Sequence, residues 1–406
     1  MKKFIIQGGR PLEGELRVHG AKNSVLPILA GTVLNGGKSI IHDCPGLRDV
    51  ESSIAILKYL GCSVKREGNT LTVDSSNAVG EDIPEKLMRE MRSSIIFLGA
   101  ILSRFGRAKI SMPGGCELGP RPIDLHLKAF RQLGIKIKEA HGYIDCIADR
   151  TTGTNIHLDL PSVGATENIM LCASTAHGIT VVSNAAKEPE IVDLQDYLNA
   201  MGAKISGAGT GVVRIEGVKR LYNAEHTVIP DRIVAGTYLA CSAMAGGMIE
   251  LKNANATHME AIISAMRECG SKIYVSNNSL IHIAPKEILP VDCVRTQVYP
   301  GFPTDDQSPL MAVLTKAKGT SIFVENIFES RFKHVVELAR MGADITVDGR
   351  MAVIRGVPKL TGASVSAMDL RGGAALIVAA LGAEGRTDID EIHHIERGYD
   401  RIEEAL

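Results

Sequence analysis

The residues with the clearest chemical potential lie in one short segment. Pro113-Gly114-Gly115-Cys116-Glu117-Leu118-Gly119-Pro120-Arg121-Pro122-Ile123-Asp124 places a cysteine five positions before an arginine. Glycine and proline at this density exclude the interior of a helix or a central strand, so we expect a surface loop. A thiol beside fixed positive charge can act as a nucleophile or a proton donor. From the local residues alone, a functional and a purely structural Cys116 are equally good interpretations.

The other seven cysteines form no CxxC pair and no dense framework. This usage is typical of a reduced, cytosolic protein rather than of a disulfide-stabilised one. Cys172 in ENIMLCASTA and Cys241 in YLACSAMA lie in helical apolar patterns. We therefore expect these seven thiols to be inert packing residues in helices.

Length and composition predict a soluble globular protein of two domains with aliphatic cores. The chain has 406 residues, of which 45% are hydrophobic and 22% charged, with no tryptophan. Its 45 basic and 46 acidic residues nearly cancel, which disfavours nucleic acid or an anionic membrane as a partner. The N-terminal MKKFIIQGG is too short for a signal peptide, and no apolar run approaches a bilayer-spanning length. The sequence gives no prediction of oligomeric state.

A period of about 70 residues runs through the chain. An amphipathic stretch, a glycine and an alternating stretch recur at intervals of 68 to 73 residues, at Gly61, Gly134, Gly202, Gly270 and Gly342. A glycine in this place is typical of the residue just past a helix end. Each amphipathic stretch is therefore predicted to be a helix that leads into a strand.

A second element recurs six times, out of phase with the first. It consists of a helix rich in small residues, a glycine turn and a β-branched strand, at residues 23–41, 92–110, 166–182, 232–251, 307–324 and 371–389. Each repeat is therefore predicted to have the element order βαβαββ, and it is too small to bury its apolar helices alone. We predict an α/β fold of two three-repeat domains, with the apolar helices inside, the sheets outside and the active site in the cleft between the domains.

The sixth repeat is expected to lack its last strand. Its helix end would fall near residue 410, but the sequence ends at RIEEAL, residues 401–406. A neighbouring strand edge without a partner would be a liability for stability.

Eight motifs carry a resemblance to a known family. HGAKNSVLPIL, MRSSIIFLG, PGGCELGPRPIDLH, SVGATENIM, FPTDDQ, ENIFESRF, MDLRGGAAL and HHIERGYDRIE follow one another along the chain. Together they closely resemble the UDP-N-acetylglucosamine 1-carboxyvinyltransferases. The resemblance implies the enolpyruvyl transferase fold, an inside-out α/β barrel in each domain, with residues 1–21 plus 230–406 in one domain and 22–229 in the other.

The same resemblance implies the reaction. The family transfers the enolpyruvyl group of phosphoenolpyruvate to the 3′-hydroxyl of UDP-N-acetylglucosamine and releases phosphate, the first committed step of peptidoglycan precursor synthesis. The implied location is the bacterial cytoplasm. No metal and no cofactor is implied, and both substrates are small molecules.

The phosphate and carboxylate of phosphoenolpyruvate call for several cations at fixed geometry. The residues that the resemblance implies for this substrate are Lys22, Asn23, Arg121, Arg371 and Arg397, with Arg92 in the same cluster. Cys116 is implied to donate a proton to the methylene carbon, and it can also add covalently to the substrate. Taken singly, charges such as Lys22 and Arg397 would be read as solvated surface residues.

Asp305 in FPTDDQ is the implied contact of the sugar 3′-hydroxyl, whose proton a carboxylate can accept. An Asx-type turn after Pro303-Thr304 would suit Asp305 and Asp306 equally, and only the family register favours Asp305. The residues implied for the UDP-sugar are Arg92, Arg121, Pro122, Ile123, Asp124, Leu125, Ser162, Val163, Gly164, Asp305 and Ile327.

Two further positions depend on context. Backbone amides of Ser162–Thr166 could hold a phosphate where a helix is expected to begin, near Thr166. Asp369 in MDLRGG is implied as a further acidic active-site residue, although an acidic residue at a helix N-terminus is common for structural reasons alone. Leu160 departs from the lysine often found there in the family, which removes one possible diphosphate contact.

Three other functions compete with this interpretation. The sister enzyme that acts on shikimate 3-phosphate has the same architecture, but the PGGC and SVGATENIM motifs disfavour it. A non-catalytic paralogue that binds the sugar nucleotide would fit a shortened sixth repeat, whereas Lys22, Cys116, Asp305 and Arg397 favour catalysis. A nucleic-acid-binding repeat protein has no support from the charge balance.

Overall fold

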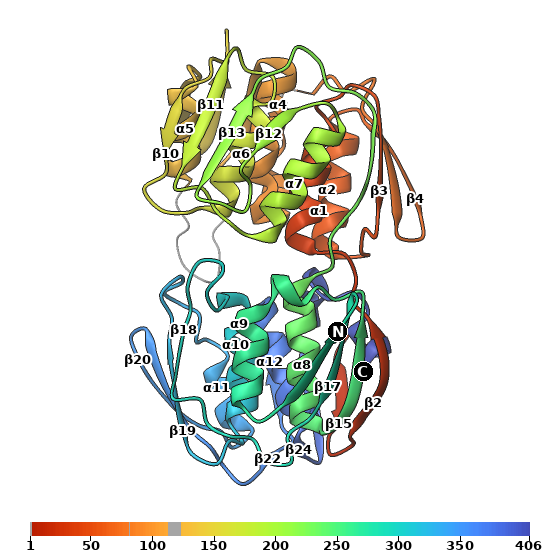
Figure 1. Cartoon of the computed structure of the whole chain (residues 1–406), viewed down its shortest axis with the longest axis vertical. Helices are drawn as coiled ribbons and strands as arrows, with labels where there is room; N and C mark the ends of the chain where they lie inside the picture. The colour runs from red at the N-terminus through yellow and green to blue at the C-terminus, as the bar shows by residue number, and fades with distance from the viewer. Residues whose placement is uncertain (1, 81, 113–122) are drawn as a thin grey trace. The chain divides into compact units, whose positions relative to one another are not determined.

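The chain forms two compact units (Figure 1). The computed structural model describes residues 2–80, 82–112 and 123–406, except for the side chain of Arg92. The first unit comprises residues 2–19 and 230–406, and the second comprises the described part of residues 20–229.

Three four-stranded sheets build the second unit on one plan. In each sheet the first two strands are parallel, and an antiparallel hairpin completes the sheet. The sheet orders are β14 (Ala224–Thr227)-β3 (Lys38–His42)-β5 (Thr70–Asp74)-β4 (Ser63–Glu67), β6 (Asp82–Ile83)-β7 (Arg107–Ser111)-β9 (Tyr143–Ile147)-β8 (Lys136–Ala140), and β10 (Asn155–His157)-β11 (Ile179–Ser183)-β13 (Val212–Glu216)-β12 (Lys204–Ser206). The helices are α1 (Lys22–Gly31), α2 (Arg48–Tyr59), α3 (Glu85–Glu90), the 3-10 helix η1 (Arg92–Ile96), α4 (Phe97–Phe105), α5 (Asp124–Gln132), α6 (Val163–Ala173) and α7 (Pro189–Ala200).

The first unit repeats this plan twice in full. Its four-stranded sheets run β2 (Leu12–Arg17)-β15 (Gly247–Lys252)-β17 (Ser279–Ile283)-β16 (Lys272–Ser276) and β18 (Cys293–Arg295)-β19 (Thr320–Val324)-β21 (Met351–Arg355)-β20 (Asp344–Asp348). A third sheet has the order β1 (Phe4–Gln7)-β25 (Arg386–Asp390)-β23 (Ser364–Ser366), and β22 (Leu360–Thr361) pairs with β24 (Ala383–Glu384). The helices are α8 (Arg232–Ala245), η2 (Ala256–His258), α9 (Glu260–Glu268), α10 (Thr304–Leu314), α11 (Val335–Arg340), α12 (Leu370–Leu381), η3 (Ile392–Arg397) and α13 (Ile402–Ala405).

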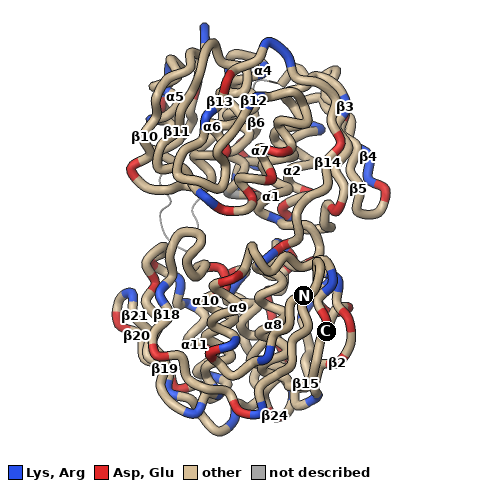
Figure 2. The backbone as a smooth tube through the Cα atoms, viewed as in Figure 1, with Lys and Arg blue, Asp and Glu red and all other residues tan. Residues whose placement is uncertain are grey.

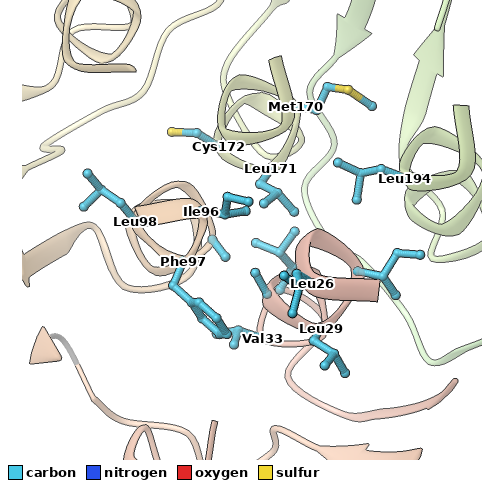
Figure 3. Packing of buried hydrophobic residues seen from close by; sticks show 14 of the residues in the cluster. Leu26, Leu29, Val33, Ile96, Phe97, Leu98, Met170, Leu171, Cys172 and Leu194 are labelled. Atoms are coloured by element: carbon cyan, nitrogen blue, oxygen red, sulfur yellow. The ribbon is translucent and has the colours of Figure 1, made fainter. Parts of the chain in front are cut away.

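The helices rich in small residues form the centre of each unit. Nearly all residues of α1, α6, α8, α10 and α12 are buried, as are six of the nine residues of α4. In the first unit α8, α10 and α12 pack on one another. In the second unit Leu26 and Leu29 of α1 lie near Phe97 of α4 and Leu171 of α6 (Figure 3). The predicted α/β fold of six repeats, with apolar helices inside and sheets outside, is confirmed.

The five predicted helix-ending glycines share one backbone conformation. Gly61, Gly134, Gly202, Gly270 and Gly342 have φ between +89° and +96°. Residues with a side chain rarely adopt this left-handed backbone conformation, so glycine is the residue that allows each helix to turn directly into its strand.

Strand pairing departs from chain order at three strands. β2 precedes α1 in sequence but pairs with β15 of the first unit, and β14 pairs with β3 of the second unit. β1 pairs antiparallel with β25, from Phe4 opposite Ile389 to Gln7 opposite Arg386. The predicted unpaired edge in the sixth repeat is therefore wrong for β25, because the first strand of the chain covers it.

The cysteine prediction holds only in part. Six of the seven described cysteines are buried, and Cys293 is exposed. Of the seven, Cys172 and Cys241 lie in helices, as predicted. The other five do not: Cys146 and Cys293 lie in strands β9 and β18, and Cys44, Cys62 and Cys269 lie in the connections between elements. All seven are free thiols. Acidic and basic residues are interspersed over each unit (Figure 2). No helix in the described part of the chain is long and apolar enough to cross a membrane.

Candidate active site

Asp305 lies at the start of α10 against two arginines of the first unit. Its Oδ1 accepts a hydrogen bond from Nη2 of Arg331 at 2.7 Å, and Nε of Arg371 lies 3.6 Å away. The Asp305 side chain keeps 28% of its surface exposed, so it remains reachable by a ligand. Two guanidinium groups therefore lie within 4 Å of this carboxylate, and the Asp305 Oδ1 is held in place as a hydrogen-bond acceptor.

The two adjacent aspartates have different environments. Both lie within the first turn of α10, so the alternative of an Asx-type turn outside a helix is wrong. Asp306 is 2% exposed, and neither of its carboxylate oxygens has a hydrogen-bond partner among the described residues. Burial raises its pKa well above the usual range despite the nearby Arg371. The tertiary structure therefore leaves Asp305 accessible beside two arginines, whereas it buries Asp306 in surroundings that raise the pKa of its carboxyl group.

Arg331 and Glu325 are functional candidates that sequence reasoning missed. Arg331 is 1% exposed and lies over the Phe328 ring, with the guanidinium carbon 5.6 Å from the ring centre. Glu325 is fully buried and accepts hydrogen bonds from the amides of Ile327 and Phe328 and from the Thr304 hydroxyl. Both belong to the motif ENIFESRF, whose three charged residues, Glu325, Glu329 and Arg331, lie among apolar ones, and this pattern is the available signal.

Arg371 is held at the start of α12. It is 4% exposed and donates from Nη1 to the Tyr399 hydroxyl at 3.1 Å. Burial opposes its charge, but Tyr399, Asp305 and Asp231 together raise its pKa. Asp369 caps the same helix, because its Oδ1 accepts from the amides of Arg371 and Gly372 at 2.9 and 3.0 Å. The structural role considered for Asp369 is thus present in the protein.

Asp369 also lies near a buried histidine. A side chain on Gly372 would meet both Asp369 Oδ2 and the Cβ of His334 at 3.0 Å. Burial lowers the pKa of His334 to about 4, so its ring is neutral at pH 7. Asp369 Oδ2 and both ring nitrogens of His334 have no hydrogen-bond partner among the described residues.

In the second unit, Lys22 is the first residue of α1 and forms a buried ion pair. Its Nζ lies 2.7 Å from Oδ2 of Asp49 at the start of α2, and the two side chains are 10% and 2% exposed. This pairing orients the ammonium at the helix start, where Asn23 follows and is half-buried.

The starts of α5 and α6 come together in the same unit. α5 and α6 are in contact, and the His126 ring lies next to Gly164. Residues 123–125 and 162–164 are therefore neighbours, as a shared ligand would require. α6 begins at Val163 rather than near Thr166, and Ser162 caps it by accepting from the Ala165 amide at 3.3 Å. The Thr166 amide donates to the Ser162 carbonyl, so the first-turn amides of Val163 and Gly164 are the better candidates for an anion.

The remaining predicted residues are placed as follows. Arg397 ends η3 and Ile327 follows β19, and both are half-buried. Leu160 is 68% exposed. Cys116, Arg121 and Pro122, with the whole predicted loop 113–122, lie outside the described residues, as does the side chain of Arg92.

The whole chain matches known enolpyruvyl transferases. The model of the EPSP synthase (3-phosphoshikimate 1-carboxyvinyltransferase) family matches residues 6–406. Two proteins of Caldanaerobacter subterraneus subsp. tengcongensis, UDP-N-acetylglucosamine 1-carboxyvinyltransferases 2 and 1, are 55% and 50% identical over all of this chain and 97% of their own length.

Solved structures agree on the fold. The enolpyruvyl transferase NikO from Streptomyces tendae superimposes with a TM-score of 0.90 at 25% identity, covering 100% of this chain and 96% of NikO. An EPSP synthase from Acinetobacter baumannii gives 0.73 at 18% identity over 98% of this chain and 96% of its own. The chain therefore belongs to the EPSP synthase family and, within it, to the UDP-N-acetylglucosamine 1-carboxyvinyltransferases.

Proposed function

We propose that this protein transfers the enolpyruvyl group of phosphoenolpyruvate to the 3′-hydroxyl of UDP-N-acetylglucosamine and releases phosphate. The observation that carries the proposal is Asp305, an accessible carboxylate positioned by Arg331 and Arg371. A carboxylate in this position can accept the hydroxyl proton as the 3′-oxygen bonds to C2 of phosphoenolpyruvate. The full-length identity to relatives that bear this enzyme name supports the choice of substrates.

The reaction has two stages. In the addition, the 3′-oxygen bonds to C2, its proton passes to Asp305, and the methylene carbon C3 gains a proton, giving a tetrahedral ketal. In the elimination, C3 loses a proton and the bond from C2 to the phosphate oxygen breaks. We assign the proton at C3 to Cys116, which can alternatively add covalently to the substrate.

The cations of the chain bind phosphoenolpyruvate and stabilise the departing phosphate. Lys22 is fixed by Asp49 and Arg371 by Tyr399, so both charges are held before the ligand arrives. Such preorganisation costs no reorganisation in the transition state. We assign this role to Lys22, Asn23, Arg121, Arg371 and Arg397.

The UDP-sugar is assigned to the starts of α5 and α6 and to Ile327. Amides of Val163 and Gly164 at a helix N-terminus are suited to the diphosphate. The remaining contacts assigned to this substrate are Arg92, Arg121, Pro122, Ile123, Asp124, Leu125, Ser162 and Asp305. Asp369 lies beside Arg371 and supports that arginine.

This reaction would place the protein in peptidoglycan precursor synthesis in the bacterial cytoplasm. The seven free thiols fit a reducing compartment. The proposed chemistry uses acid, base and cationic side chains and calls for no cofactor.

Phosphate release from phosphoenolpyruvate tests the proposal. It should require UDP-N-acetylglucosamine, be absent without an acceptor, and be absent with shikimate 3-phosphate. Asp305→Asn should lower the rate by about 100-fold or more, the range expected for a general base. Release with shikimate 3-phosphate would point to the sister enzyme. Binding of the UDP-sugar without any release would point to a non-catalytic paralogue.

A further inference from the structure

Glu391, His393 and His394 bring three possible metal ligands together at the end of the sixth repeat. One ligand atom from each residue lies within 4.8 Å of the other two. Nδ1 of His393 is 3.2 Å from Oε2 of Glu391. The centroids of the His393 and His394 rings are 4.0 Å apart, and the ring planes are tilted by 36° to each other. The cluster is accessible, because the side chains of His393 and Glu391 are 43% and 42% exposed.

Comparison with other repeats of the chain shows which features of this cluster are particular to the sixth repeat. Glu391 has φ +56°, and Asp43, Asn184 and Asn253 have φ of +53° to +56° directly after β3, β11 and β15. The left-handed turn therefore recurs in three other repeats and needs no ligand to explain it. Two positions beyond the turn, however, those three repeats carry Pro45, Ala186 and Asn255, whereas the sixth repeat carries His393 followed by His394.

We propose that Glu391, His393 and His394 bind a divalent transition-metal ion, represented by zinc. Two imidazoles and one carboxylate suit zinc, nickel, cobalt or copper, whereas magnesium and calcium prefer sets of oxygen ligands. A tetrahedral zinc ion holds its ligand atoms about 3.4 Å apart, given bonds of about 2.1 Å. Rotation of these half-exposed side chains closes the remaining gap, and solvent supplies the fourth ligand.

The site shares one short segment with Arg397. η3 spans Ile392–Arg397, and His394 and Arg397 are three residues apart within it. Residues with this spacing in a 3-10 helix are expected on the same side. A metal held by His394 adds positive charge beside Arg397 and fixes the segment that carries it. Occupancy should therefore change the KM for phosphoenolpyruvate more than the KM for the UDP-sugar. This consequence rests on the proposed function, whereas metal binding itself does not.

Calorimetric titration of untagged full-length protein with zinc tests the site. A Cys116→Ser background keeps the loop thiol from contributing. One zinc ion should bind per chain, and magnesium should not bind at the same concentrations. His393→Ala and Glu391→Gln should each weaken zinc binding by at least about tenfold, since even outer-shell partners are worth about 10–100-fold. The matched control His177→Ala removes an exposed histidine of the second unit and should bind as the parent does.

Two further readouts separate binding from misfolding and from the proposed function. Cobalt bound to the parent should give ligand-field absorption that His393→Ala loses while keeping the parent's melting temperature without metal. Unaltered zinc affinity in His393→Ala, or no zinc binding by the parent, overturns the site. In the chain with Cys116 intact, a KM for phosphoenolpyruvate that does not respond to bound zinc overturns the link to Arg397. Activity is measured on the chain with Cys116 intact, and its absence there together with intact zinc binding counts against the proposed function alone.

Discussion

The guanidinium of Arg331 binds the Thr304 carbonyl and the Asp305 carboxylate at the same time. Nε and Nη2 donate to the carbonyl at 3.2 and 3.0 Å, and Nη2 also donates to Asp305 Oδ1 at 2.7 Å. One buried cation thus fixes both the beginning of α10 and the acidic side chain that this helix presents. Asp305 is positioned by its neighbours before any substrate binds.

Arg331→Lys should therefore impair the chemical step. A lysine keeps the charge but cannot form the planar fork that holds both oxygens. We expect kcat to fall by about 100-fold, within the range attributed to a correctly placed general base. Steady-state phosphate release measures it. Arg350→Lys, at an exposed arginine paired with Glu329, is the matched control and should keep the parent's kcat. Equal kcat in both variants would show that Arg331 does not position Asp305.

Asp49→Asn should destabilise the protein by about 3 kcal/mol, because it leaves the buried Lys22 ammonium without its carboxylate. Urea unfolding measures the loss. Asp149→Asn breaks the exposed pair with Lys136 and should leave the unfolding midpoint unchanged. If the two variants unfold at the same urea concentration, the Lys22–Asp49 pair has no special role. The KM of Asp49→Asn for phosphoenolpyruvate should also rise, since the ammonium is no longer oriented.

Gly99→Ala should disrupt the packing of α4 on α6. An added methyl would lie 2.5 Å from the Asn168 carbonyl oxygen and 2.6 Å from its Oδ1, which accepts from the Gly99 amide. Overpacking of this kind costs about 1–3 kcal/mol. Gly211→Ala offers a control with the same chemical change, because the nearest atom there is 3.7 Å away. Thermal melting of both variants should separate them, and a parent-like melting temperature for Gly99→Ala would contradict the close packing.

Stability should fall in mild acid because of His282. Burial lowers its pKa from 6.5 to about 4, and the neutral ring bonds the hydroxyls of Ser242 and Ser271. Between these values the unfolded chain binds a proton that the folded protein does not. The free energy of unfolding should thus drop by about 2 kcal/mol from pH 7.5 to pH 5 through this group. Urea titrations at both pH values should show a smaller drop in His282→Gln, and an equal drop would exclude His282 as the cause.

The contribution of Asp306 to the free energy of unfolding should change with pH in the direction opposite to that of His282. Burial raises its pKa, so the folded protein retains a proton that the unfolded chain releases above its ordinary value of 3.8. Its contribution to stability is present in acid and is lost as the pH rises. Asp306→Asn keeps the shape without the titration, so the gain in unfolding free energy over the parent should be larger at pH 8 than at pH 5. A gain that does not depend on pH would mean that Asp306 is not protonated when folded.

Much of the fold follows from local sequence. The helix-ending glycines and the six apolar helices are short-range patterns. A glycine in the left-handed region ends a helix, and a helix that is apolar all round must be buried, whatever the rest of the chain does. They were sufficient to predict six repeats in two groups of three. The motifs were specific enough to identify the family.

The pairing of strands and the burial of charged residues could not be predicted from local sequence patterns. β1, β2 and β14 pair with strands far from them in sequence, since a strand edge accepts whichever segment the tertiary packing brings to it. The residues around Lys22 alone predict a surface charge, and no sequence pattern singles out Arg331 from the other charged residues of its motif. Only the fold surrounds them with carboxylates and carbonyls that make a buried charge tolerable. Tertiary structure also gives Asp305 and Asp306 different environments, although the two residue types are identical. They lie on different faces of α10, so that the Asp305 carboxylate contacts arginine and the Asp306 carboxylate is enclosed by the core.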